Sequence, residues 1–153
     1  MVASSGTDTH RSMPPEVRIG ANRVYAYDNT QDEILDGLRR GHSFVISGPE
    51  IQFTAETEDS KASMGDLVKP GQLKLKMGWS LGLNGFDPFE LDAVLIKNNE
   101  TLGRWSCGDH SDSEFTTISK EADWFTLELR DPRGELHALS NPIFVGQQVG
   151  TWR

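Results

Sequence analysis

The stretch HSFVISGPEIQFTAET, residues 42–57, alternates apolar and polar side chains on both sides of one turn. Residues 42–46 form the first run, and Gly48-Pro49 ends it, since proline has no amide hydrogen to donate inside a sheet. In the second run, Ile51, Phe53 and Ala55 fall on one side of an extended chain. The pattern predicts two adjacent β-strands with one face turned to a hydrophobic core.

The rest of the chain repeats this pattern of short strands, with turn signals about 8 to 12 residues apart. Asn98-Asn99-Glu100 and Asp131-Pro132-Arg133-Gly134 have the composition of tight turns. Together they predict a mainly β protein, a β-sandwich of immunoglobulin-like type with one short helix and an irregular N-terminal arm. The further strands are predicted over 23–27, 73–77, 91–97, 101–105, 115–118, 124–130, 136–139 and, as a closing edge strand, 141–145.

A helix is predicted over residues 31–40. Thr30 and Glu33 have the spacing of a capping box, in which each side chain binds the backbone amide of the other residue. Ile34 and Leu38 share one face, and Gly41 follows as a left-handed cap.

Composition restricts the partners that the chain can have. Its 153 residues suit one domain. The net charge of −8, without a clustered basic patch, argues against nucleic acid and anionic membranes as main partners. No apolar run approaches the roughly 18 to 20 residues of a membrane span. Cys107 is the single cysteine, so no disulfide forms within the chain.

The clearest candidate for chemistry is Asp8-Thr9-His10, near the amino terminus. In extended backbone, side chains two residues apart point to the same side, so Asp8 and His10 can reach one metal ion. The alternative is a solvated polar loop. Zinc takes about four ligands, or three protein ligands and a water. The pair therefore predicts part of a metal site, and we expect the chain to be the tail of something larger.

Further motifs accompany this pair in a fixed order: Asn22-Arg23-Val24-Tyr25, residues 34–45 with Gly48-Pro49, Gly65-Asp66, residues 94–98 and Asn141-Pro142-Ile143-Phe144-Val145. With Gly6-Thr7-Asp8-Thr9-His10 placed before them, this set resembles the carboxy-terminal part of PHP-domain metallohydrolases of the CehA/McbA type. The resemblance covers nearly the whole chain.

The resemblance implies that residues 1–22 are the remnant of a distorted β/α barrel and that residues 23–153 are a helix plus β-sandwich domain. It implies that Asp8 and His10 belong to the last metal-ligand motif, and that the remaining ligands lie in a barrel preceding residue 1. The implied cofactor is a divalent metal, zinc, manganese or iron, and the implied substrate is a small-molecule ester, most plausibly a phosphoester. By itself, the chain should bind such a metal weakly.

Other polar and aromatic residues are given simpler interpretations. Residues 107–112, with a thiol, an imidazole and two carboxylates, are predicted to be a polar hairpin loop. His42 follows the helix cap, where it can interact with the negative end of the helix dipole. The resemblance, in which this position is commonly arginine, implies a contact with a phosphate or another domain as the alternative to this structural role. His137 lies at an alternating strand position and needs no functional explanation.

Two alternatives to the hydrolase remain open. One is a non-enzymatic β-sandwich module that binds carbohydrate or protein, with a sugar-stacking surface drawn from Trp79, Trp105 and Trp152, while Trp124 is predicted to pack in the core. The other is a tail that gives its barrel only stability or oligomer contacts.

Overall fold

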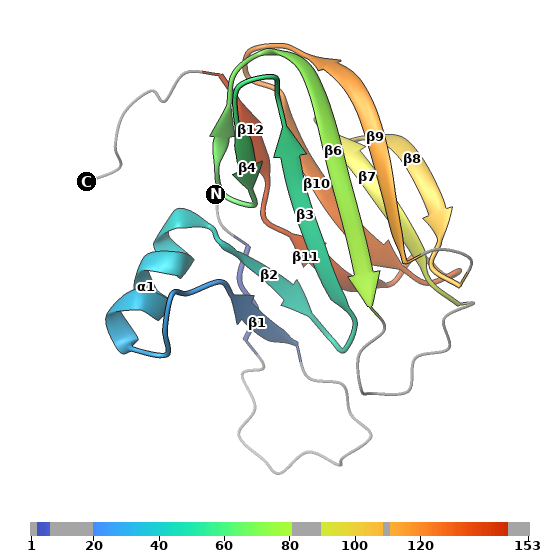
Figure 1. Ribbon diagram of the computed structural model, residues 1–153. Coiled ribbons are helices and arrows are strands. Elements are labelled where there is room, and N and C mark those ends of the chain that lie inside the picture. The colour runs from blue at the N-terminus through green and yellow to red at the C-terminus, as the bar shows by residue number, and fades with distance from the viewer. Residues whose placement is uncertain (1–2, 7–19, 81–89, 109–110, 147–153) are drawn as a thin grey trace.

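Two β-sheets packed face to face, with one helix at their side, make up the body of the protein. The computed structural model describes residues 3–6, 20–80, 90–108 and 111–146. The smaller sheet has the antiparallel order β4-β3-β6-β9, and the larger has β1-β2-β11-β10 with β7-β8 on the far edge of β10 (Figure 1). The elements are β1 Ala21–Val24, α1 Gln31–Arg40, β2 Ser43–Ile46, β3 Glu50–Glu56, β4 Lys61–Ser63, β5 Leu67–Val68, β6 Gly71–Ser80, β7 Asp92–Lys97, β8 Glu100–Ser106, β9 Asp112–Ser119, β10 Trp124–Arg130, β11 Leu136–Ser140 and β12 Ile143–Val145.

The period-two pattern correctly predicted which side chains of the smaller sheet face inward. Ile51, Phe53 and Ala55 of β3 are buried, and the strand pairs with β6 along its whole length. The mainly β fold and its sandwich of sheets are confirmed. The immunoglobulin-like subtype and the division of the chain after residue 22 stay predictions.

β10 is the central strand of the larger sheet. β7 pairs with one edge of β10, while β11 and β12 share the other. Residues 125–129 of β10 are all buried, and other strands pair with both of its edges. Its sequence still alternates, because the apolar Phe125, Leu127 and Leu129 fall on one face and the buried polar Thr126 and Glu128 on the other.

The predicted helix is confirmed with its bounds. The Thr30 hydroxyl accepts from the Glu33 amide at 3.4 Å, and Gly41 ends the helix with φ 75°. The second half of the predicted capping box is wrong, because the Thr30 amide donates to Asp28 Oδ1 at 2.8 Å instead. An Asx turn therefore takes the donor that Glu33 was expected to bind.

The predicted closing edge strand is also wrong in its position. β12 lies between β10 and β5, with which it pairs in parallel. β5 has two residues and β4 has three, so neither has enough length to show a period in the sequence. The strand predicted over 23–27 ends earlier, at Val24, and Tyr27 beyond it is exposed. Among the described residues, no helix has the length and apolar character needed to cross a bilayer.

A cluster of charges on the smaller sheet predicts a pH dependence of stability. Glu56 accepts from Lys76 and Lys61, each at 2.9 Å. The bond from Lys76, followed by that from Lys61, lowers the pKa of Glu56 from 4.5 to about 2. Because the folded-state pKa is depressed, the stabilisation is present above the unfolded pKa and is lost as pH falls toward the folded one.

We therefore expect Glu56→Gln to flatten the fall of the melting temperature between pH 4.5 and about 2. Thermal unfolding followed by circular dichroism at several pH values measures this slope. Glu100→Gln, at an exposed position of β8, is the control and should leave the slope as it is. Equal slopes for the wild type and Glu56→Gln would mean that the lowered pKa of Glu56 does not contribute to the pH dependence of stability.

Candidate functional site

Asp8 and His10, the predicted metal ligands, lie outside the described residues, but the segment just before them is described. The Ala3 amide donates to Asn141 Oδ1 at 2.6 Å. The Ser5 amide donates to Asn22 Oδ1, and Asn22 Nδ2 donates back to the Ser5 carbonyl, both at 2.9 Å. The chain leading to Asp8 is thus hydrogen-bonded to the sandwich at two points.

Asn141 connects this segment to the larger sheet. Its side chain is fully buried, and Nδ2 donates to the Ser43 carbonyl at 2.8 Å and to Ser43 Oγ at 2.9 Å. Ser43 begins β2, directly after the helix cap and His42. One buried amide therefore joins the start of the chain, the helix–strand junction and the segment before β12.

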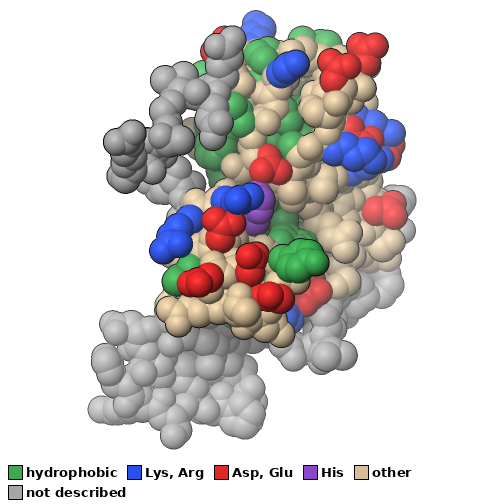
Figure 2. Space-filling model, turned by 60° about the vertical axis from the view of Figure 1, so that its left-hand side comes forward, with side chains coloured by type: hydrophobic (Ala, Val, Ile, Leu, Met, Phe, Trp, Pro, Cys, Tyr) green, Lys and Arg blue, Asp and Glu red, His purple; other side chains and the backbone are tan. Residues whose placement is uncertain are grey.

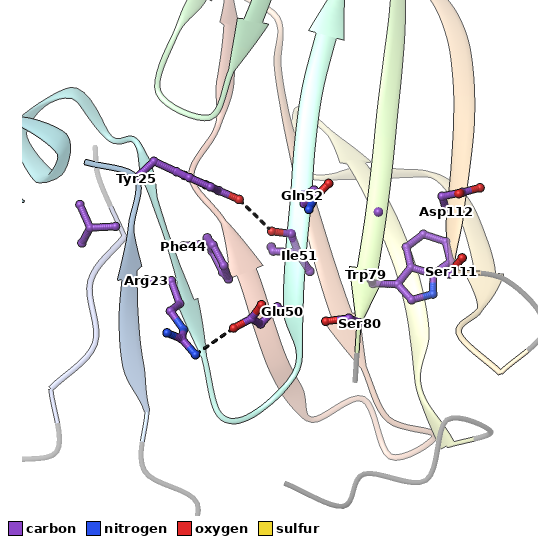
Figure 3. A pocket seen from close by; sticks show the side chains of 12 residues that line it. Arg23, Tyr25, Phe44, Glu50, Ile51, Gln52, Trp79, Ser80, Ser111 and Asp112 are labelled. Atoms are coloured by element: carbon purple, nitrogen blue, oxygen red, sulfur yellow. Dashed lines mark hydrogen bonds and ion pairs between the residues drawn. The ribbon is translucent and has the colours of Figure 1, made fainter. Parts of the chain in front are cut away.

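A pocket of about 480 Å³ opens where β1 and β2 approach β3 and β6 (Figure 3). Arg23 Nη2 lies 2.8 Å from Glu50 Oε1, and the Tyr25 hydroxyl donates to the Ile51 carbonyl at 3.4 Å. The other labelled lining residues are Phe44, Gln52, Trp79, Ser80, Ser111 and Asp112. The volume falls within the range of small-molecule sites.

The electrostatics of this pocket favour hydrogen bonding rather than nucleophilic chemistry. Burial, and then the charge of Glu50, raise the pKa of Tyr25, so its hydroxyl stays protonated at neutral pH. Arg23 and Glu50 neutralise each other. Sequence reasoning missed this pocket, because its lining comes from strands far apart in the chain. The signal available in advance was the period-two pattern, which places Trp79 on the inward face of β6.

His42 has a structural contact with the turn that joins β4 to β5. Its Nε2 lies 2.9 Å from Asp66 Oδ1, while Asp66 Oδ2 accepts from the Ser63 amide at 2.8 Å. The carboxylate therefore ties the end of the helix to this turn. A phosphate or interdomain contact of His42 stays a prediction.

The segment 107–112 is not the hairpin loop that was predicted. β8 belongs to the larger sheet and β9 to the smaller one, so the segment crosses between the sheets. Cys107 is buried, and burial, followed by the charge of Asp92, raises the pKa of its thiol to about 12. A thiol that is buried and protonated is not a nucleophile at neutral pH. Asp109 and His110 lie outside the described residues.

The described tryptophans do not form an exposed stacking platform. Trp79 is buried, and Trp105 is half-buried with its ring edge-on to Phe115 at 6.3 Å. Trp124, predicted to be in the core, is half-buried at the start of β10. Trp152 lies beyond the described residues.

One group of three side chains in the described chain has the composition of a metal site. Asp131, Glu135 and His137 place one ligand atom each within 4.8 Å of the others, at the turn between β10 and β11. The sequence pattern did not predict a metal site here, because a turn explained Asp131 and an alternating strand position explained His137.

No protein-family model matches the chain, and no curated protein sequence matches it. The resemblance to PHP-domain hydrolases therefore depends on the ordered motifs alone.

Proposed function

We propose that the chain is the C-terminal segment of a metal-dependent hydrolase of the PHP type, and that its sandwich positions the last metal-ligand loop of a preceding barrel. The observation that carries the proposal is the anchoring of residues 3–5 by Asn141 and Asn22. A ligand contributes fully to metal affinity only when its backbone is held in place. The sandwich supplies such a support directly before Asp8.

The chemistry of the donor pair fits this proposal. A carboxylate and an imidazole suit zinc, manganese and iron. When bound, such a metal polarises a phosphoryl oxygen and lowers the pKa of water. Asp8 and His10 would provide two of the metal's ligands, and the sandwich would keep both in a fixed orientation. The barrel would provide the others, so the chain is proposed to be inactive alone.

The helix side of the molecule offers a surface for the proposed barrel. Tyr27 is 95 % exposed, and Tyr25 and Ile34 are partly exposed beside it. Figure 2 shows hydrophobic side chains among the acidic ones over this face of α1. Asp32 and Glu33 give the first helical turn negative charge, while Arg39 and Arg40 lie in the last turn. A neighbouring domain with basic and apolar groups would cover this surface, and the barrel is our proposed occupant.

The experiment is to express the reading frame extended upstream of residue 1 and to assay hydrolysis of p-nitrophenyl phosphate and bis-p-nitrophenyl phosphate with Mn²⁺ or Zn²⁺. We expect a His-x-His motif upstream. Asp8→Ala or His10→Ala should lower kcat/KM at least about 100-fold, since loss of residues that only support a ligand already costs about 10- to 100-fold.

Thr9→Ala is the matched control, because the extended backbone expected from the sequence would turn its side chain away from Asp8 and His10. It should retain activity close to the wild type. A stop codon directly upstream, or full activity in both ligand variants, would overturn the proposal.

A second candidate function, saccharide binding, is favoured by the pocket. Trp79 and Phe44 give it apolar walls, while Gln52 and Ser80 offer neutral donors and acceptors. That combination suits a neutral polyhydroxylated ligand. Titration of the chain with a panel of oligosaccharides, followed by tryptophan fluorescence, tests it. Binding that Gln52→Ala weakens would support this function, and no response to any member of the panel would count against it.

A further inference from the structure

The turn between β10 and β11 brings Asp131, Glu135 and His137 together. Gly134, with φ 84°, lets the chain reverse between the first of these residues and the other two. Glu135 lies directly before β11 and His137 lies within it, and each places a ligand atom within 4.8 Å of one on Asp131. The three residues lie close together in the sequence, and their arrangement does not depend on any other domain.

Asp131 is oriented by the backbone of its own turn. Its Oδ1 accepts from the Arg133 amide at 2.9 Å and from the Glu135 amide at 2.8 Å. Oδ2 then faces His137, whose Nε2 is 3.8 Å away.

His137 is oriented from the opposite side by Ser47, in the loop after β2. Ser47 Oγ lies 3.2 Å from His137 Nδ1 and donates to the His137 carbonyl at 3.4 Å. In the tautomer whose Nδ1–H donates to Ser47 Oγ, the Nε2 lone pair is on the side of the Asp131 carboxylate. Metal-binding histidines are held in this way, with the other ring nitrogen donating to an oxygen.

The separation of His137 Nε2 from Asp131 Oδ2 suits a cation bound between them better than a direct hydrogen bond. At 3.8 Å, Nε2 and Oδ2 are too far apart for a good hydrogen bond. Metal–ligand bonds of about 2.0 to 2.2 Å in a tetrahedron place ligand atoms roughly 3.3 to 3.6 Å apart, so a small inward movement suffices. The side chains of Asp131 and His137 are 18 % and 15 % exposed, so the site opens to solvent chiefly beside Glu135.

Arg130, the residue before Asp131, has partners outside the three proposed ligands. Arg130 Nε binds Glu128 Oε2, and Arg130 Nη1 donates to the Gly134 carbonyl at 2.6 Å. The guanidinium is thereby held against the turn and its own carboxylate partner. The carboxylate of Glu135 is left to complete the group on the solvent side.

We propose that Asp131, Glu135 and His137 form a second divalent-metal site, which binds Zn²⁺ with three protein ligands and one water. One imidazole with two carboxylates suits zinc better than magnesium or calcium, which prefer oxygen ligands alone. A bound ion joins the end of β10 to the start of β11 and stabilises the hairpin. This site is separate from Asp8 and His10 and does not depend on the proposed hydrolase.

The test uses the chain itself, freed of metal with a chelator and then titrated with ZnCl₂ by isothermal calorimetry, with the melting temperature measured in parallel. We expect one zinc per chain at this site and a rise in melting temperature. His137→Gln and Glu135→Gln should each weaken zinc binding at least about tenfold. The Asp8→Ala, His10→Ala double variant and His42→Gln are the controls and should retain the site.

A second measurement keeps the test decisive if a variant folds poorly. Imidazole ¹H–¹⁵N spectra of the wild type should show the Nε2 signal of His137 move on addition of Zn²⁺, while that of His42 stays in place. An unchanged His137 signal, with no calorimetric uptake at millimolar zinc, would show only an Asp131–His137 ion pair and overturn the proposal. Uptake that only the Asp8 and His10 variants abolish would overturn it too, and would support the proposed hydrolase instead.

Discussion

Leu127→Ala is expected to lower the free energy of unfolding by about 2–5 kcal/mol, the range for a fully buried leucine whose removal leaves a cavity. Leu127 has no exposed surface and pairs with Leu95, which is equally buried, across β7 and β10. β10 has neighbouring strands on both edges, so the site has little freedom to collapse. Urea unfolding followed by circular dichroism measures the loss.

Leu67→Ala is the matched control, because the same side chain on β5 is 40 % exposed. Its effect should stay within about 0.5 kcal/mol, as for most surface substitutions. Similar losses for the two variants would mean that β10 is not the centre of the core.

The sequence was sufficient to predict a helix or strand when one face of that element meets water and the other meets the core. β3 shows this, because Ile51, Phe53 and Ala55 alternate with exposed or half-buried residues. α1 also has local signals at both ends, in Thr30 and Gly41, and its bounds were predicted without error. These features depend on residues close together in the chain.

Features that depend on distant pairing could not be predicted in the same way. β12 lies inside its sheet because β5, from the other half of the chain, covers its outer edge. The pocket joins Tyr25 to Trp79, and nothing in the sequence relates the two positions. Asp28 displaced Glu33 from the Thr30 amide because two acceptors competed for one donor, and the pattern alone does not rank them.

The two candidate metal sites also differ in how far the sequence alone could predict them. Asp131, Glu135 and His137 lie within seven positions of one another. The sequence did not indicate a metal site there, because aspartate and glycine are common in turns and a turn already explained the segment. The orientation of the His137 ring depends on Ser47, which lies in a loop far from it in the sequence. Asp8 and His10 stay a prediction from the motif.

Asn141→Ala is expected to destabilise the protein by about 2–4 kcal/mol, because buried groups left without a partner cost about 1–3 kcal/mol each. The substitution removes the acceptor of the Ala3 amide and the donor to Ser43 Oγ. The Ser43 carbonyl keeps the Asn141 amide at 3.3 Å, which limits the loss. Chemical denaturation measures the change in stability.

The same variant separates a local anchor from a general loss of stability. Amide hydrogen exchange at Ala3 should become faster in Asn141→Ala by more than the fall in global stability accounts for, since the arm loses its buried contact while the sheets keep theirs. Asn22→Ala, which removes the exposed bonds to Ser5, is the control and should speed exchange at Ser5 with little effect on unfolding. Unchanged exchange at Ala3 would mean that Asn141 serves the junction at Ser43 alone, and the proposed hydrolase would lose the support on which the position of Asp8 depends.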